Sequence, residues 1–162
     1  MWASKSPNRI RMAVASLVLS ASALIGIAVS EGYVGQTYYD SGRVASLGFG
    51  ETQGVTPGQT TTPVRALVNL GRSVDLYAQG VRSCVKVPLF QYEFDAYVDL
   101  AYNVGVKGFC TSPVLDKVNR QDYLGACQEL LTTHLNDHLG NLSQGLINRR
   151  NSEYQTCIGA SQ

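Results

Sequence analysis

The strongest constraint on this chain is a stretch of nineteen residues, 12–30, that carries no charged side chain. As one helix this stretch would span roughly 28 Å, just enough to cross a hydrocarbon core of roughly 30 Å. The only charged side chains before residue 31 are basic: Lys5, Arg9 and Arg11. Basic residues ahead of an apolar segment keep the N-terminus in the cytoplasm, so the pattern predicts export of everything from residue 31 onward.

The composition of residues 12–30 is weak for a permanent anchor. Eight of the nineteen residues are Leu, Ile or Val, and nearly all the others are Ala, Ser or Gly. A cleaved signal peptide is also open, since residues 21–23 and 28–30 both fit a small-x-small cleavage pattern. The residues alone leave both alternatives standing.

The next stretch, residues 31–52, is rich in glycine and begins with the carboxylate of Glu31. A second carboxylate, Asp40, precedes Ser41 and Gly42 in a turn sequence, so the stretch predicts a small irregular β-hairpin. A hairpin with little side-chain volume can form one wall of an open cleft. Two carboxyl groups with different roles are what hydrolysis of a glycosidic bond requires, although a solvated turn would have the same spacing.

The spacing of these residues resembles the active-site signature of phage endolysins of glycoside hydrolase family 24. The signature is Glu, eight residues, Asp, five residues, and then T-x-G-x-G-x-T. Its matching positions here are Glu31, Asp40, Gly42, Gly48, Gly50 and Thr52. Ser46 stands where the family has Thr, and Glu51 stands where it usually has His. The resemblance continues through residues 94–119 and 145–159, in the same order and at similar spacing.

The resemblance implies an α+β, lysozyme-like fold with a small β-hairpin lobe, a mainly helical lobe and an N-terminal apolar helix. Residues 31–162 would form the catalytic domain of a monomeric muramidase without a cofactor. It would hydrolyse the β-1,4 bond between N-acetylmuramic acid and N-acetylglucosamine in peptidoglycan and lyse the host. Glu31 is then the general acid, Asp40 stays ionised and Ser46 helps to position the water. Inversion would require carboxyl groups roughly 6.5–9.5 Å apart.

The resemblance also adds a third alternative for residues 1–30, an uncleaved signal-arrest-release segment. Such a segment holds the enzyme inactive on the host inner membrane with its N-terminus in the cytoplasm, then leaves the bilayer and joins the enzyme in the periplasm. While residues 12–30 lie in lipid, Glu31 would be held at the headgroups, away from Asp40. Two other functions stay open: a lytic transglycosylase, and a catalytically inactive peptidoglycan-binding protein, for which Ser46 and Glu51 are the only indications.

Helices are predicted downstream of the hairpin from apolar periodicity and capping residues. Their ranges are 63–82, 88–105, 113–118, 122–133 and a last helix reaching 158. Tyr97 and the other aromatic side chains of the second helix are expected in the core. Arg149 and Arg150, in the last helix, are expected to form structural ion pairs rather than sugar contacts. Residues 133–143 are expected to form a cleft wall or lid.

Four cysteines, all after residue 31, allow two disulfides in any of three pairings in an oxidising compartment: Cys84, Cys110, Cys127 and Cys157. Because residues 12–30 contain no cysteine, release is expected without a thiol from that segment. His134 and His138 have helical i,i+4 spacing, but Gly140 and the missing glutamate of a metalloprotease motif favour a surface loop over a metal site. With a net charge of +1, nothing suggests nucleic-acid binding.

Overall fold

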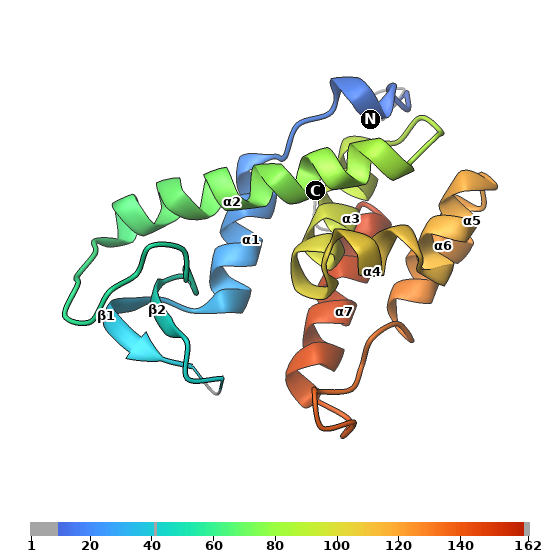
Figure 1. Cartoon of the computed structure of the whole chain (residues 1–162). Helices are drawn as coiled ribbons and strands as arrows, with labels where there is room; N and C mark the ends of the chain where they lie inside the picture. Colours follow the sequence, from blue (N-terminus) through green and yellow to red (C-terminus); the bar gives the residue numbers. More distant parts are fainter. Residues whose placement is uncertain (1–9, 41, 161–162) are drawn as a thin grey trace, which may run out of the picture.

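The computed structural model describes residues 10–40 and 42–160, and it has two unequal lobes (Figure 1). The smaller lobe contains an antiparallel hairpin of β1 (Val34–Tyr39) and β2 (Ala45–Gly48). The larger lobe is built from α3 (Gln91–Val104), α4 (Val106–Cys110), α5 (Pro113–Asn119), α6 (Tyr123–Leu130) and α7 (Gln144–Cys157). The long helix α2 (Pro63–Cys84) runs across both lobes. This architecture confirms the α+β class, with a small hairpin lobe and a mainly helical lobe.

Helices α2, α5 and α6 begin where the sequence predicts, because each of these starts has a side-chain cap, whereas α3 begins at Gln91 instead of residue 88 and α4 was not predicted as a separate helix. The side chains of Thr62, Ser112 and Asp122 accept hydrogen bonds from backbone N–H groups three residues later. Such caps satisfy donors that have no partner inside the helix. The sixth helix, α6, is shorter than predicted and ends at Leu130 instead of reaching residue 133. Helix α3 ends at the predicted position, where Gly105 has a φ of 82°.

The apolar segment 12–30 is not one helix, so the predicted N-terminal apolar helix is not confirmed as a single element. A 3₁₀ turn at Val14–Ser16 is followed by extended chain, and α1 (Ala21–Glu31) begins only after Ser20. The side chain of Ser20 accepts a hydrogen bond from the N–H of Ala23, and this cap fixes the helix start. No helix in the described ranges is both long and apolar enough to cross a bilayer.

The segment 10–31 packs onto the helical lobe. Leu17 and Ile27 are fully buried in the main core, beside Phe94 and Tyr97 of α3. The backbone of Met12 pairs with that of Leu89 through two hydrogen bonds of 2.8 and 2.9 Å. Apolar side chains of this segment are therefore part of the protein core. The aromatic residues of α3 lie in this core, as the sequence predicts.

The hairpin is held against α2 by close backbone packing. Gly48, paired with Val34, has a φ of 67°. A Cβ atom there would lie 2.9 Å from the Cβ of Ala66 in α2, so a larger residue would push the strand away from the helix. On the same face, Glu51 accepts a 2.9 Å hydrogen bond from the side chain of Asn69. The residue that departs from the family pattern thus ties the hairpin lobe to α2.

Two disulfides cross-link the helical lobe. Cys84 pairs with Cys110, and Cys127 pairs with Cys157, so one of the three possible pairings is selected. Neither disulfide involves the N-terminal segment or the hairpin.

Candidate active site

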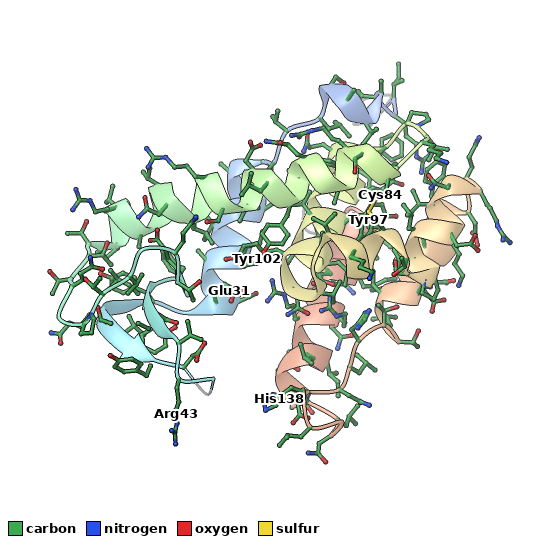
Figure 2. All side chains as sticks on the ribbon, in the orientation of Figure 1. Glu31, Arg43, Cys84, Tyr97, Tyr102 and His138 are labelled. Carbon is green, nitrogen blue, oxygen red and sulfur yellow. A yellow bond between two sulfur atoms is a disulfide. The ribbon has the colours of Figure 1, made fainter. Side chains whose placement is uncertain are left out.

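Glu31 lies at the junction of the two lobes (Figure 2). It is the last residue of α1, whereas the sequence had suggested that it begins the hairpin region. Gly32 ends the helix with a φ of 73°, which turns the chain into β1. The Glu31 side chain is one quarter exposed, and Nη1 of Arg149 lies 2.8 Å from its Oε1 atom. The helix end therefore fixes this carboxylate in a partly buried position beside a cation.

Arg149 contacts carboxylates from three helices. Besides Glu31, its Nη2 and Nε atoms donate to Oδ1 of Asp99 at 2.6 and 3.0 Å. Its Nε atom also lies 3.5 Å from Oε1 of Glu153. The fully buried Arg150 pairs with Glu153 and donates to Asn103. The two arginines were expected to form structural ion pairs; the pairs exist, and one of them involves Glu31 itself.

The charges in this cluster shift the pKa values of its members. Burial raises the pKa of Glu153 to about 8, and the charge of Asp99 adds to that effect. Burial alone would lower the pKa of Arg149, but the charges of Asp99 and Glu31 outweigh it and raise the value. Burial, followed by the charge of Glu31, raises the pKa of Tyr102 to about 12. Arg149 is therefore a permanent cation here, and Tyr102 is a neutral phenol.

Asp40 lies in the turn that connects β1 and β2. Its Oδ1 atom accepts a 2.8 Å hydrogen bond from the N–H of Val44, and its backbone N–H donates to the Val44 carbonyl at 3.1 Å. These bonds fix the carboxylate by one oxygen at an exposed position. Ser41, the next residue of the predicted turn, lies outside the described residues, as do Lys5 and Arg9 of the N-terminal charge pattern.

Ser46 lies inside the hairpin, on β2. Only 2% of the residue is exposed, and its hydroxyl donates to the carbonyl of Val44 at 3.2 Å. Because the proton is engaged in that bond, the hydroxyl oxygen is left to accept a hydrogen bond.

The sequence reasoning did not identify Asp99 as part of this site. On α3, Asp99 and the buried Asp95 lie one turn apart on a helix that is otherwise buried in the core. Acidic residues on a core-facing helix surface need polar partners, so their presence in an apolar helix pattern could have indicated an ion-pair site. For Asp99 the partner is Arg149, 50 positions later in the sequence.

A polar groove of about 390 Å³ lies beside this cluster. Its lining comes from α1 and α7: Ser30, Ser143, Gly145, Leu146, Asn148, Arg149 and Ser152. Hydroxyl, amide and guanidinium groups of this kind can bind the hydroxyl and acetamido groups of a sugar.

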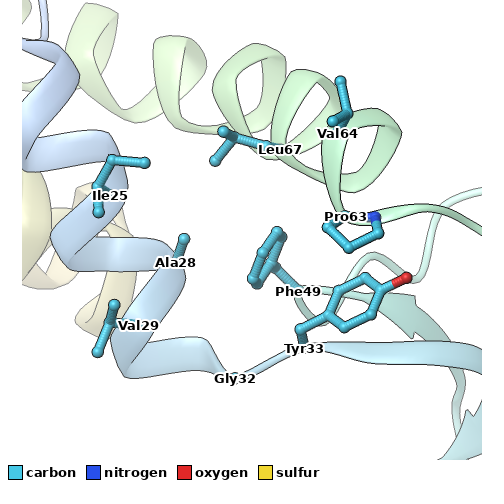
Figure 3. Close-up of a pocket in the computed structure, with 9 residues that line it drawn as sticks. All are labelled: Ile25, Ala28, Val29, Gly32, Tyr33, Phe49, Pro63, Val64 and Leu67. Atoms are coloured by element: carbon cyan, nitrogen blue, oxygen red, sulfur yellow. The ribbon is translucent and has the colours of Figure 1, made fainter.

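A second pocket, of about 430 Å³, lies between α1, α2 and the hairpin lobe and is almost entirely apolar (Figure 3). Its walls include Ile25 and Val29 of α1, Phe49, and Val64 and Leu67 of α2. The lining contains no carboxylate, histidine or cysteine, and its one hydroxyl, that of Tyr33, donates to the carbonyl of Thr61 at 2.8 Å.

His134 and His138 lie exposed in the loop between α6 and α7, where Asn136 pairs with Leu142. The two histidines therefore do not share a helix face. Within the described part of the chain, no group of three or more His, Cys, Asp or Glu residues could hold a metal ion.

Comparison with known proteins gives a consistent set of relatives. The family model "Phage lysozyme" matches residues 28–153. The SAR-endolysin of Enterobacteria phage P21 is 30% identical over 96% of this chain and 99% of its own length. The SAR-endolysin of Pseudomonas phage phiKMV is 31% identical over 87% of this chain and 89% of its own.

Solved structures agree with the sequence relatives. The endolysin from Escherichia coli O157:H7 phage FAHEc1 superposes with a TM-score of 0.83 at 26% identity, covering 93% of this chain and 98% of that one. The muramidase domain of SpmX from Asticaccaulis excentricus gives a TM-score of 0.82 at 26% identity, over 88% and 98% of the two chains. The fold is therefore lysozyme-like, and the family match covers both Glu31 and Arg149. The chain belongs to the phage lysozyme family and is a glycoside hydrolase of the lysozyme type.

Proposed function

We propose that this protein is an endolysin that hydrolyses the β-1,4 bond between N-acetylmuramic acid and N-acetylglucosamine in peptidoglycan and so lyses the host cell. The observation that carries the proposal is the placement of Glu31, a partly buried carboxylate at the end of α1, beside Arg149 and a polar groove. In this assignment Glu31 protonates the leaving oxygen of the glycosidic bond. Arg149 then stabilises the carboxylate that the donation leaves behind.

Asp40 and Ser46 act from the opposite lobe. Asp40, fixed in the hairpin turn by the N–H of Val44, stays ionised and acts as the base that activates a water. Ser46 accepts a hydrogen bond from that water and orients it. Attack by a water on the face opposite the leaving group inverts the anomeric carbon. Glu31 gives its proton to the leaving oxygen as the glycosidic bond breaks, Asp40 takes a proton from the water that forms the new bond, and no cofactor is needed.

We propose that the substrate is a glycan strand of the wall and that the enzyme acts as a monomer. The groove between α1 and α7 would bind sugar or peptide groups next to the cleaved bond. Ser143, the last residue of the loop predicted to form a cleft wall or lid (residues 133–143), lines this groove.

Residues 1–30 are proposed to act as a signal-arrest-release segment, and residues 31–162 as the catalytic domain. The names of the relatives in phages P21 and phiKMV support this type. The segment first holds the protein on the host inner membrane with its N-terminus in the cytoplasm. After release into the periplasm, residues 21–31 form α1 and bring Glu31 to Arg149. In the membrane-bound state Arg149 lacks that partner and the enzyme lacks its acid.

The substitution Glu31→Gln tests the proposed function. Glutamine keeps the volume and the hydrogen bond from Arg149 but cannot donate a carboxyl proton, so hydrolysis of purified peptidoglycan should fall by at least about 100-fold. Asp116→Asn, which neutralises an exposed acid on α5, is the matched control and should keep full activity. An unchanged rate in Glu31→Gln would refute the assignment.

The products separate this proposal from its two alternatives. A hydrolase releases fragments with a reducing-end N-acetylmuramic acid, and mass spectrometry detects the added water. A lytic transglycosylase would instead give anhydro products without that water. A peptidoglycan-binding protein would release no fragments, although it would still sediment with the wall.

A further inference from the structure

Arg149 divides its hydrogen bonds between two carboxylates that come from different helices. One terminal nitrogen donates to Glu31 on α1 at 2.8 Å. The other terminal nitrogen and Nε both donate to Oδ1 of Asp99 on α3, at 2.6 and 3.0 Å. Asp99 therefore makes the larger share of the contacts with this guanidinium. The side chain of Arg149 is only 9% exposed, so water cannot easily replace either partner.

The cluster contains more acid than base. Three carboxylates, those of Glu31, Asp99 and Glu153, face the guanidinium groups of Arg149 and Arg150. When every group is ionised, the cluster carries one uncompensated negative charge in a poorly solvated place. Such a cluster holds one proton more tightly than an isolated carboxylate does. Within it, burial and then the charge of Asp99 raise the pKa of Glu153 to about 8, so Glu153 is the member that takes up this proton.

Other ionisable groups near this cluster come from neighbouring elements. Tyr102 on α3, whose pKa burial raises to about 12, packs against the ring of Tyr77 on α2, and Glu51 of the hairpin lobe bonds to Asn69. Asp95 on α3 bonds to the backbone N–H of Ser20 and to Gln91. None of these bonds involves Arg149. Outside α1, Asp99 accepts two hydrogen bonds from Arg149, whereas Glu153 forms a longer ion pair of 3.5 Å with it.

We propose that Asp99 is a positioning residue of the reaction, which holds Arg149 in place through two hydrogen bonds and takes up much of its charge, so that the guanidinium does not act on Glu31 alone. Without the charge of Asp99, Arg149 would act on Glu31 alone and would favour its ionised, inactive form. The inference rests on the proposed role of Glu31 as the acid, and it assigns Asp99 a task that requires a carboxylate.

The test is the substitution Asp99→Asn in the full-length released protein. Asparagine keeps an oxygen that can accept from Nε and Nη2 but removes the charge. The alkaline limb of the kcat profile on purified peptidoglycan should move to lower pH by about 1 unit, with KM little changed. Asp99→Ser, a smaller neutral residue, should give the same shift and serves if the asparagine variant does not fold.

The matched control is Asp95→Asn. Asp95 is one turn earlier on α3 and lines the same cavity of about 130 Å³ as Asp99, but it bonds to Ser20 and Gln91 instead of Arg149. It should leave the alkaline limb at the wild-type pH. A wild-type limb in both Asp99 variants, or an equal shift in Asp95→Asn, would overturn the inference.

Glu31→Gln separates this inference from the proposed function. If Glu31→Gln keeps activity, the acid is elsewhere and both proposals fall. If Glu31→Gln is inactive while the Asp99 variants keep the wild-type profile, only the role of Asp99 falls. A rate reduced equally at every pH would show that Asp99 merely supports the fold.

Discussion

Arg11 and Glu93 are 82 positions apart in the sequence, yet Nη2 of Arg11 lies 2.7 Å from Oε1 of Glu93. Glu93 is 3% exposed and also accepts a 2.8 Å hydrogen bond from the N–H of Phe90. The guanidinium of Arg11 lies over the rings of Phe90 and Tyr123, 4.2 and 3.6 Å from their centroids. The end of the N-terminal segment is therefore fastened by charge as well as by apolar packing.

Arg11→Gln should destabilise the purified soluble protein by about 1–3 kcal/mol. Removing one partner of a buried ion pair leaves the other charge uncompensated, and the partial exposure of Arg11 keeps the loss below the value for a fully buried pair. Urea unfolding of the purified wild type and variant measures the difference in the free energy of unfolding. Arg120→Gln, which breaks the exposed pair with Asp116, is the control and should change stability by less than about 1 kcal/mol. Equal losses in the two variants would contradict the buried role of Glu93.

The stability of the folded protein should fall as the pH rises from 4.5 to about 8. Burial raises the pKa of Glu153 from 4.5 to about 8, so the folded state holds a proton over a range in which the unfolded state has lost it. Stability therefore decreases with pH in that window, by at most about 5 kcal/mol.

Thermal unfolding across the pH range checks this expectation, with Glu153→Gln as the comparison. Glutamine mimics the protonated acid and should flatten the pH dependence, with little change at the acidic end. If the wild type becomes more stable between pH 5 and pH 8, or if the variant keeps the same slope, Glu153 does not bind the proton.

Gly26→Leu should delay lysis without lowering the activity of the released enzyme. A leucine near the middle of a membrane helix contributes roughly −0.5 kcal/mol to insertion, so it should prolong anchoring. In the folded protein Gly26 is exposed, and a Cβ atom there would meet no atom within 4 Å. The time to lysis of an expressing culture gives the result.

Gln79→Leu, an exposed change on α2, is the control for Gly26→Leu and should leave the timing unchanged. The intact mass of the periplasmic protein should be that of the full-length chain. Unchanged timing in Gly26→Leu, together with a mass that begins at Leu24 or Glu31, would show an ordinary cleaved signal peptide.

Each disulfide should contribute about 3.5 kcal/mol to the stability of the helical lobe. The Cys84–Cys110 and Cys127–Cys157 bridges span 26 and 30 residues, and closing loops of this length removes a similar entropy from the unfolded chain. Replacing either pair by serine should lower the unfolding midpoint in urea. The segment 10–31 contains no cysteine, so the same variants should keep the release step. Release that depends on either pair would contradict this expectation.

The sequence was informative where structure follows from local chemistry. Thr62-Pro63 and Ser112-Pro113 start helices through a cap and a fixed φ, and Gly105 ends one with a positive φ. The hairpin followed from glycine density and turn residues. Glu31, Asp40 and Ser46 were proposed from their spacing and its resemblance to a family, and Glu31 does lie at the junction of the lobes beside a cation.

Local chemistry could not predict partners that are distant in the sequence. The contacts of Arg149 with Glu31 and of Arg11 with Glu93 join residues 118 and 82 positions apart, and no local pattern encodes such a pairing. The cysteine pairing depends on the tertiary packing of α2 on α4 and of α6 on α7. The division of residues 12–30 into a turn, a stretch of extended chain and α1 depends on the cap at Ser20 and on backbone pairing with Leu89.

Both disulfides close without any residue of the segment 10–31. In the proposed membrane-bound state, both disulfides can therefore form before α1 has taken its place against the helical lobe. The protein then resembles a split enzyme whose smaller fragment is stored in lipid and remains covalently attached. Activation of this zymogen would need neither a protease nor a reductant, because a tethered fragment docks at a high effective concentration. The time of lysis would then be set by the rate at which the apolar segment leaves the bilayer.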